Sequence, residues 1–187
     1  VIPVVFHLLV PPATAAPSYD VSVELLERQL QRVSDAFNRK ITTDPNAGNA
    51  KVVFKLATYD QNGLKMQEPG KNVENITAAD FTAMGTSSTK TTQYLAYILA
   101  NSKRIIWDPN KYMNIWIAKF TTSTSNTGTT TSYRMLAPTV MHSDYELTSI
   151  PGITMKHKDA FNLSDVTNCL EVGFMLNLNA LLSPTTV

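Results

Sequence analysis

One acidic side chain, Glu171, lies in the apolar stretch NCLEVGFMLNLNALL, residues 168–182. A carboxylate in such a stretch is costly to bury unless it has a polar partner or a chemical task. The residues around Glu171 therefore decide whether this stretch is an ordinary core helix or the remains of a catalytic element.

The other reactive side chains form no recognisable catalytic set. The histidines, His7, His142 and His157, are far apart in the sequence and lack metal-ligand spacing, so we expect structural or exposed roles. The lone cysteine, Cys169, has no neighbouring base, which predicts an unreactive thiol and excludes an intrachain disulfide. No nucleophile elbow, phosphate-binding loop or dinucleotide fingerprint is present.

Composition predicts one globular domain over residues 1–187. The chain has a formal net charge of +1, and 43% of its residues are hydrophobic, which suits a chain with a proper core. No Lys/Arg-rich run supports nucleic-acid binding, and no apolar run reaches the roughly 20 residues of a membrane span. We therefore expect neither nucleic acid nor a membrane span.

The periodicity of apolar residues predicts a mixed α/β order around one sheet. The first ten residues form a continuous apolar run, typical of a central strand covered on both faces. Residues 121–132 are almost wholly Thr, Ser, Asn and Gly, which predicts an exposed loop. The predicted strands are 1–10, 51–59, 112–120 and 133–141. The predicted helices are a short one opening at 77–80, a weak one over 88–101, one from 162 onward, and one over 22–39 with Ser22 as its cap and an apolar stripe of Leu26, Leu30, Val33 and Phe37.

These segments together resemble the pappalysin-type metzincins, zinc endopeptidases found in secreted and bacterial lipoprotein forms. The resemblance implies an α/β (α+β) fold with a twisted, mostly parallel sheet, an antiparallel edge strand, an opening helix and a zinc helix. In chain order, the segments that carry it are VIPVVFHLL, RVSDAFNRK, KVVFKLATYDQNG, WDPNKYMNIWIAKF, SYRMLAP and FNLSDVTNCLEVGFMLNL.

The zinc helix of metzincins has the pattern H-E-x-x-H-x-x-G/N-x-x-H/D. Its histidines lie one turn apart and bind one metal, and its glutamate is the general base for zinc-bound water. In this chain, Glu171 occupies the position of that base, and Gly173 and Asn177 also match. Glu171 therefore reads as a vestigial general base.

The three ligand positions of the pattern hold residues that cannot bind a metal. Leu170 and Phe174 replace the two helix histidines, and Ala180 replaces the third ligand. A zinc site needs three neutral or anionic donors, so we expect no cofactor, although the family uses zinc. Without zinc, water keeps a pKa near 15.7 and Glu171 has nothing to activate. An ordinary amphipathic core helix explains the same spacing, and both readings are compatible.

The resemblance implies a secreted or surface-attached protein, lipoprotein-anchored in some family members. We expect a non-catalytic pseudo-metalloprotease that binds an extended peptide or protein at its vestigial cleft, through the edge strand of Ser132, Tyr133, Arg134, Met135 and Leu136. The alternatives are an active peptidase with a non-standard metal site and a purely structural interaction domain. The family's C-terminal subdomain has no counterpart before Val187, so we expect it to be lost or to lie outside this sequence.

Overall fold

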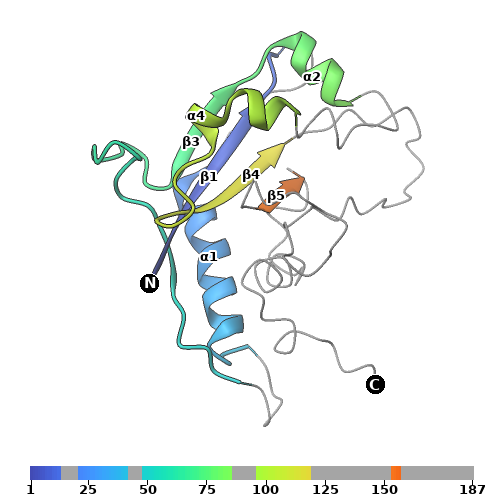
Figure 1. Cartoon of the computed structure of the whole chain (residues 1–187). Helices are drawn as coiled ribbons and strands as arrows, with labels where there is room; N and C mark the ends of the chain where they lie inside the picture. The colour runs from blue at the N-terminus through green and yellow to red at the C-terminus, as the bar shows by residue number, and fades with distance from the viewer. Residues whose placement is uncertain (14–20, 42–47, 86–95, 119–152, 157–187) are drawn as a thin grey trace, which may run out of the picture.

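The chain folds around one sheet of parallel strands. The computed structural model describes residues 1–13, 21–41, 48–85, 96–118 and 153–156. The strands are β1 (Ile2–Val10), β2 (Phe54–Leu56), β3 (Lys71–Asn75), β4 (Met113–Ala118) and β5 (Ile153–Lys156). β1 is central, with β4 on one side, β2 and β3 on the other, and β5 beyond β4 (Figure 1). All pairings between these strands are parallel, which confirms the predicted mixed α/β fold with a mostly parallel sheet.

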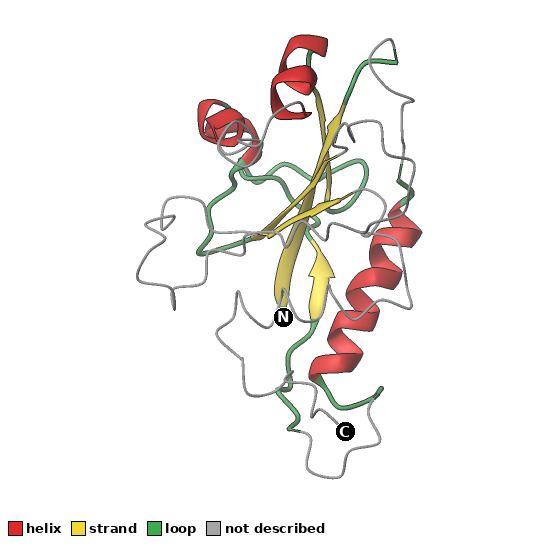
Figure 2. Ribbon diagram, turned by 90° about the vertical axis from the view of Figure 1, so that its right-hand side faces the viewer, coloured by secondary structure: helices red, strands yellow, loops and turns green. Residues whose placement is uncertain are grey.

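Helical segments lie on both sides of this sheet. The long helix α1 lies along one face, and the shorter segments lie on the other side (Figure 2). Among the described residues, no helix is long and apolar enough to cross a bilayer. The helical segments are α1 (Val23–Phe37), α2 (Ala78–Gly85), residues 96–100 and α4 (Ser102–Ile105).

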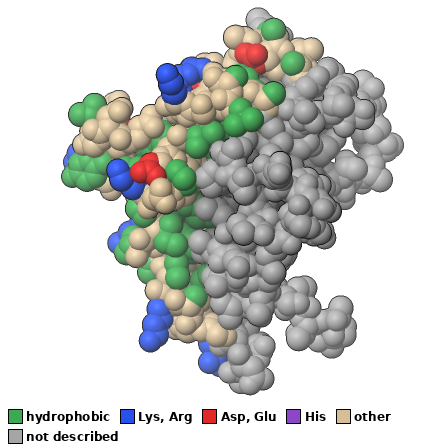
Figure 3. Space-filling model, viewed as in Figure 1, with side chains coloured by type: hydrophobic (Ala, Val, Ile, Leu, Met, Phe, Trp, Pro, Cys, Tyr) green, Lys and Arg blue, Asp and Glu red, His purple; other side chains and the backbone are tan. Residues whose placement is uncertain are grey.

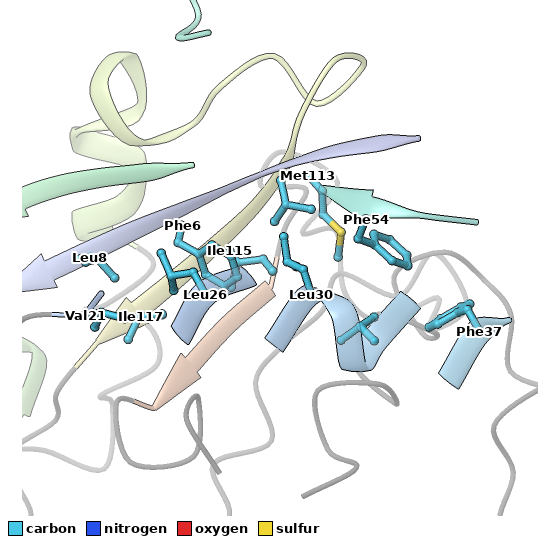
Figure 4. Close-up of a cluster of buried hydrophobic side chains, with 12 residues drawn as sticks. Phe6, Leu8, Val21, Leu26, Leu30, Phe37, Phe54, Met113, Ile115 and Ile117 are labelled. Carbon is cyan, nitrogen blue, oxygen red and sulfur yellow. The ribbon is translucent and has the colours of Figure 1, made fainter. Parts of the chain in front are cut away.

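The helix α1 begins and packs as the sequence predicts. The hydroxyl of Ser22 accepts a hydrogen bond from the backbone N–H of Leu25 at 3.3 Å, which caps the first turn. The predicted apolar stripe is buried against the sheet (Figure 4). Complete burial of Leu26 contributes about 2 kcal/mol to folding. The stripe consists of Leu26, Leu30, Val33 and Phe37.

The central strands β1 and β4 send alternate side chains to opposite faces. On the α1 side these are apolar: Val4, Phe6 and Leu8 from β1, and Met113, Ile115 and Ile117 from β4. On the other side they include the polar residues His7 and Asn114 beside Trp116. Both faces are buried, which confirms the prediction of a central, doubly covered strand at the start of the chain.

A closed loop over residues 57–70 separates β2 from β3, and both strands pair with the same edge of β1. Val4 accepts a hydrogen bond from Ala57, Ala57 accepts one from Gly70, and Gly70 accepts one from Phe6, each at 2.7–2.8 Å. Gly70 has a φ of 65°, and a Cβ there would lie 2.6 Å from a methyl group of Leu56. The backbone therefore needs glycine where the chain returns to the sheet.

Several predicted boundaries differ from the structure. The strand predicted over 51–59 is shortened to β2, because the closed loop begins at residue 57. β3 and β5 were not predicted, and their short segments KNVEN and ITMK form strands by pairing with buried neighbours. The helix predicted to open at 77–80 is confirmed as α2, with the Thr77 hydroxyl accepting the Asp80 N–H. The helix predicted over 88–101 is helical at 96–100, its earlier part lying outside the described residues.

The remaining predicted elements also lie outside the described residues. They are the exposed loop over 121–132, the antiparallel edge strand over 133–141 and the helix from 162 onward.

Candidate functional site

All residues of the predicted cleft lie outside the part of the chain that the structure describes. They are Leu170, Glu171, Phe174 and Ala180 of the predicted zinc helix and Ser132, Tyr133, Arg134, Met135 and Leu136 of the predicted edge strand. Among the described residues, a network of buried polar side chains lies on the face of the sheet opposite α1.

The end of α4 is held to the sheet by side chains that bond its free carbonyl groups. The last carbonyls of any helix lack partners within the helix. Here Arg104 O accepts a hydrogen bond from the Asn72 amide at 3.2 Å, and Ile105 O accepts one from the Trp116 indole at 2.7 Å. Lys103 O likewise accepts one from Gln61 at 3.0 Å. Side chains of the sheet and of the closed loop thus position the segment that follows α4.

Asn114 bonds both backbone groups of one residue in that segment. Its Oδ1 accepts the N–H of Trp107 at 3.0 Å, and its Nδ2 donates to the carbonyl of Trp107 at 2.8 Å. This pairing fixes which end of the Asn114 amide faces His7, whose Nε2 lies 2.8 Å from the same Oδ1. Because an oxygen faces it, Nε2 must carry the proton of the imidazole ring.

The other ring nitrogen of His7 is an acceptor. Asn72 uses its amide to donate both to Arg104 O and to His7 Nδ1, at 2.8 Å from the latter. A second ring proton would meet that donor, so the hydrogen bonds fit only the neutral ring. Burial lowers the pKa of His7 from 6.5 to about 4, with the Asn114 hydrogen bond acting in the opposite direction.

This arrangement makes His7 structural. The ring is fully buried, both nitrogens are engaged, and it lies between Trp107 and Trp116 at centroid distances of 5.7 and 5.8 Å. A general base or metal ligand needs a nitrogen open to substrate or metal. The expectation of a structural histidine is therefore confirmed for His7, whereas His142 and His157 lie outside the described residues.

A second polar cluster joins β3 to the helical segments. The Glu74 carboxylate is 9% exposed and accepts from the Arg104 guanidinium at 2.6 Å and from the Tyr97 hydroxyl at 3.3 Å. The pKa of Tyr97 is raised to about 12, chiefly by burial and further by the Glu74 and Asp80 carboxylates. These side chains line a pocket of about 580 Å³ between α2 and the helical residues 96–100.

No sequence pattern predicted this cluster. Lys103 and Arg104 are both exposed, and Arg104 also pairs with the nearly buried Glu74 carboxylate. Glu74, Tyr97 and Arg104 come from three separate segments, and their spacing in the sequence carries no signal. Only the pairing of β3 with β1, which the sequence analysis also missed, places Glu74 beside the other two.

The described residues include no group of three His, Cys, Asp or Glu side chains that could hold a metal ion. The fold resemblance implies a zinc site in the predicted zinc helix, and its donors can be tested by their chemistry. Leu170, Phe174 and Ala180 carry no oxygen, nitrogen or sulfur in their side chains. Zinc requires such donors, so these residues do not fit the metal.

On the face drawn in Figure 3, the Lys and Arg side chains of the described residues lie in small separate groups rather than in a stripe. An electrostatic footprint for nucleic acid would be a continuous basic patch. The described surface on this face offers none, and the absence of a nucleic-acid partner stays a prediction for the whole chain.

Comparison with known proteins identifies a fold but no family. No family model matches the chain, and neither does any curated protein. Similar solved structures include mature mirolysin of Tannerella forsythia in complex with a cleaved peptide (20% identity, TM-score 0.58) and a promirolysin mutant (19%, 0.56). Mirolysin in complex with compound 9 is also similar (19%, 0.53).

Each comparison covers 94% of this chain but only 55–62% of the mirolysin chain. The chain thus spans less than two thirds of the structures that it matches. At such low identity the likeness shows the fold alone. Mirolysin is a metzincin-type zinc metalloprotease, so the chain has a metzincin-like fold.

Proposed function

We propose that this protein is a non-catalytic, pappalysin-like relative of the metzincin proteases that binds an extended peptide or protein segment. One observation carries the proposal. In a chain with a metzincin-like fold, the zinc-helix pattern retains Glu171 but has Leu170, Phe174 and Ala180 at its three ligand positions.

Without the zinc ligands, the peptide-cleaving reaction of the metzincins has no metal to activate water. A metzincin cleaves peptides because zinc lowers the pKa of its bound water and the glutamate takes the proton. Without zinc, water keeps a pKa near 15.7, so Glu171 alone cannot activate it. The side chains at the ligand positions are hydrocarbon and offer hydrophobic contacts instead of coordination.

The proposed peptide-binding role rests on the predicted edge strand. An extended peptide can add as a strand to the free edge of a sheet, using backbone hydrogen bonds for affinity. We assign this role to Ser132–Leu136, and mirolysin has been solved with a cleaved peptide bound. The family resemblance further suggests a secreted or surface-attached protein, lipoprotein-anchored in some members.

The catalytic half of the proposal is tested by metal content and cleavage. We expect the purified protein to contain no stoichiometric zinc and to show no chelator-sensitive cleavage of a broad peptide substrate. The triple variant Leu170→His, Phe174→His, Ala180→His restores the donor set and should take up zinc. Zinc bound to the unmodified chain, or cleavage abolished by a chelator, would mean an active peptidase instead.

The binding half is tested by proline substitution in the predicted edge strand. Adjacent residues of a strand point their N–H groups to opposite sides. We therefore expect one of Arg134→Pro and Met135→Pro to weaken binding of an extended peptide by about tenfold, and the other to lower the melting temperature. The matched variants Arg134→Ala and Met135→Ala keep the N–H group and should do neither.

If the unmodified protein binds no extended peptide in fluorescence anisotropy, the binding half is wrong. The chain would then be a structural interaction domain.

A further inference from the structure

The pocket between α2 and the helical residues 96–100 has a defined polar end. Glu74 and Asn75 form the last two residues of β3, and both line the pocket. Open parallel sheets commonly bind ligands outside the carboxyl ends of their strands. The position of the pocket therefore suits a ligand, and its lining decides which kind.

One oxygen of the buried Glu74 carboxylate remains available. Oε1 accepts both the Arg104 and the Tyr97 hydrogen bonds. No described residue bonds Oε2, and Oε2 is not among the fully buried atoms that lack a partner. Glu74 lines the pocket, and its Oε2 has no hydrogen-bond partner among the described residues.

The charges that line the pocket leave it negative. Glu74 and Asp80 each contribute one negative charge, and Arg104 contributes the positive charge. The guanidinium of Arg104 is directed at Glu74 Oε1 and at the side chain of Asn101. Asp80 uses one oxygen to accept from Thr77, which leaves its other oxygen without a described partner. Two carboxylate oxygens are thus available to a donor.

Small apolar side chains line part of the pocket, among its polar ones. Ala83 lies on α2, and Ala96 and Ala100 lie on the opposite helical segment. The ring of Tyr97 also lines the space. A volume of about 580 Å³ between such side chains accommodates an alkyl chain, with its polar end at the carboxylates.

We propose that this pocket binds a primary alkylammonium group, as carried by a lysine side chain or by a free alkylamine. An ammonium supplies three donors and one positive charge on a flexible alkyl stem, which matches the carboxylate oxygens and the alanine walls. A divalent metal ion fits less well, because two carboxylates beside a guanidinium supply too few donors. The proposal uses none of the residues on which the peptide-binding function rests.

The test is an NMR titration of the isotope-labelled protein with three probes. They are Nα-acetyl-lysine N-methylamide, n-butylamine and the uncharged analogue Nα-acetyl-norleucine N-methylamide. We expect the lysine compound to shift the backbone amide signals of Ala83 and Ala100 in a saturable way, and the norleucine compound to leave them unchanged. Binding of n-butylamine as well would identify the free ammonium as sufficient, whereas its failure would identify a lysine residue of a peptide as the ligand.

Three variants test the carboxylates. Glu74→Gln should raise the dissociation constant by about tenfold or more, because it replaces a buried charged acceptor. Asp80→Asn should raise it by about threefold, as expected for a partly exposed pair. Glu27→Gln removes the same charge from the exposed surface of α1 and should change nothing.

Equal shifts with the norleucine compound, or no shift with either charged probe, would overturn the proposal. So would unchanged affinity in Asp80→Asn, the variant that decides the matter if Glu74→Gln fails to fold. None of these outcomes bears on peptide binding or zinc content, so this proposal and the proposed function fail separately.

Discussion

The two faces of the central sheet are built from the same strands but bury different chemistry. On the α1 side, β1 and β4 contribute only apolar side chains to the core. On the other side they contribute His7 and Asn114 among tryptophans, all nearly or fully buried. Amphipathicity does not explain this difference, because neither face is exposed to water.

The difference lies in what covers each face. The backbone groups of a helix form hydrogen bonds with one another, so α1 needs only apolar contacts with the sheet. The opposite face is covered partly by the irregular segment after α4, whose backbone groups need partners when buried. Asn72, Asn114 and Trp116 supply them. Polar residues in a buried strand can therefore indicate a face that is covered by irregular chain.

The strongest test of this comparison substitutes two neighbouring residues of β4, one on each face of the sheet. Asn114→Leu leaves the N–H and C=O of Trp107 and the Nε2–H of His7 without partners, which should reduce the free energy of unfolding by about 4 kcal/mol. Ile115→Leu, on the α1 side, should cost less than about 1.5 kcal/mol. Urea denaturation measures both, and similar losses in the two variants would contradict the assigned difference between the faces.

The polar face should also be the acid-sensitive one. The pKa of His7 is about 4 in the folded protein and near 6.5 unfolded, so its contribution is complete above pH 6.5 and is lost as the pH falls towards 4. The loss between pH 7 and 4 should approach about 3 kcal/mol. His7→Gln keeps one donor and one acceptor but cannot titrate.

Denaturation curves across this pH range should therefore be steeper for the unmodified protein than for His7→Gln. Parallel profiles for the two proteins would show that His7 does not titrate in the way its hydrogen bonds require.

The smallest effect is expected at Asn38, where the same pair of side-chain to backbone hydrogen bonds is only half-buried. Asn38, just after α1, accepts from the Val52 N–H at 3.0 Å and donates to the Val52 carbonyl at 2.6 Å, as Asn114 does for Trp107. Because Asn38 is only half-buried, water can replace its bonds, and Asn38→Leu should cost about 1 kcal/mol. A loss as large as that of Asn114→Leu would show that burial does not set the difference.

Periodicity predicted the apolar half of this comparison. The α1 stripe, its Ser22 cap and the central strand at the start of the chain all followed from local patterns. The polar half depends on contacts between segments distant in the sequence. His7 and Asn114, for example, are 107 residues apart, and no local rule pairs them.

For the candidate cleft, the sequence carries the signal, but its residues are not among those that the structure describes. Glu171 and its replaced ligand positions come from a motif that the sequence displays directly, and they stay predictions because they lie outside the described residues. The Glu74 pocket is described in atomic detail, yet it had no sequence signal. Its residues meet only because β3 pairs with β1 after the closed loop.

The closed loop over residues 57–70 also makes the molecule a convenient scaffold for engineering. Its two ends are joined by the bond from Gly70 to Ala57, and the strands on either side pair with β1 independently. Asn62 and Gly63 at its tip are exposed. A short affinity tag or fluorophore site inserted between them should leave the register of the sheet unchanged, which gives a reporter position without altering β1.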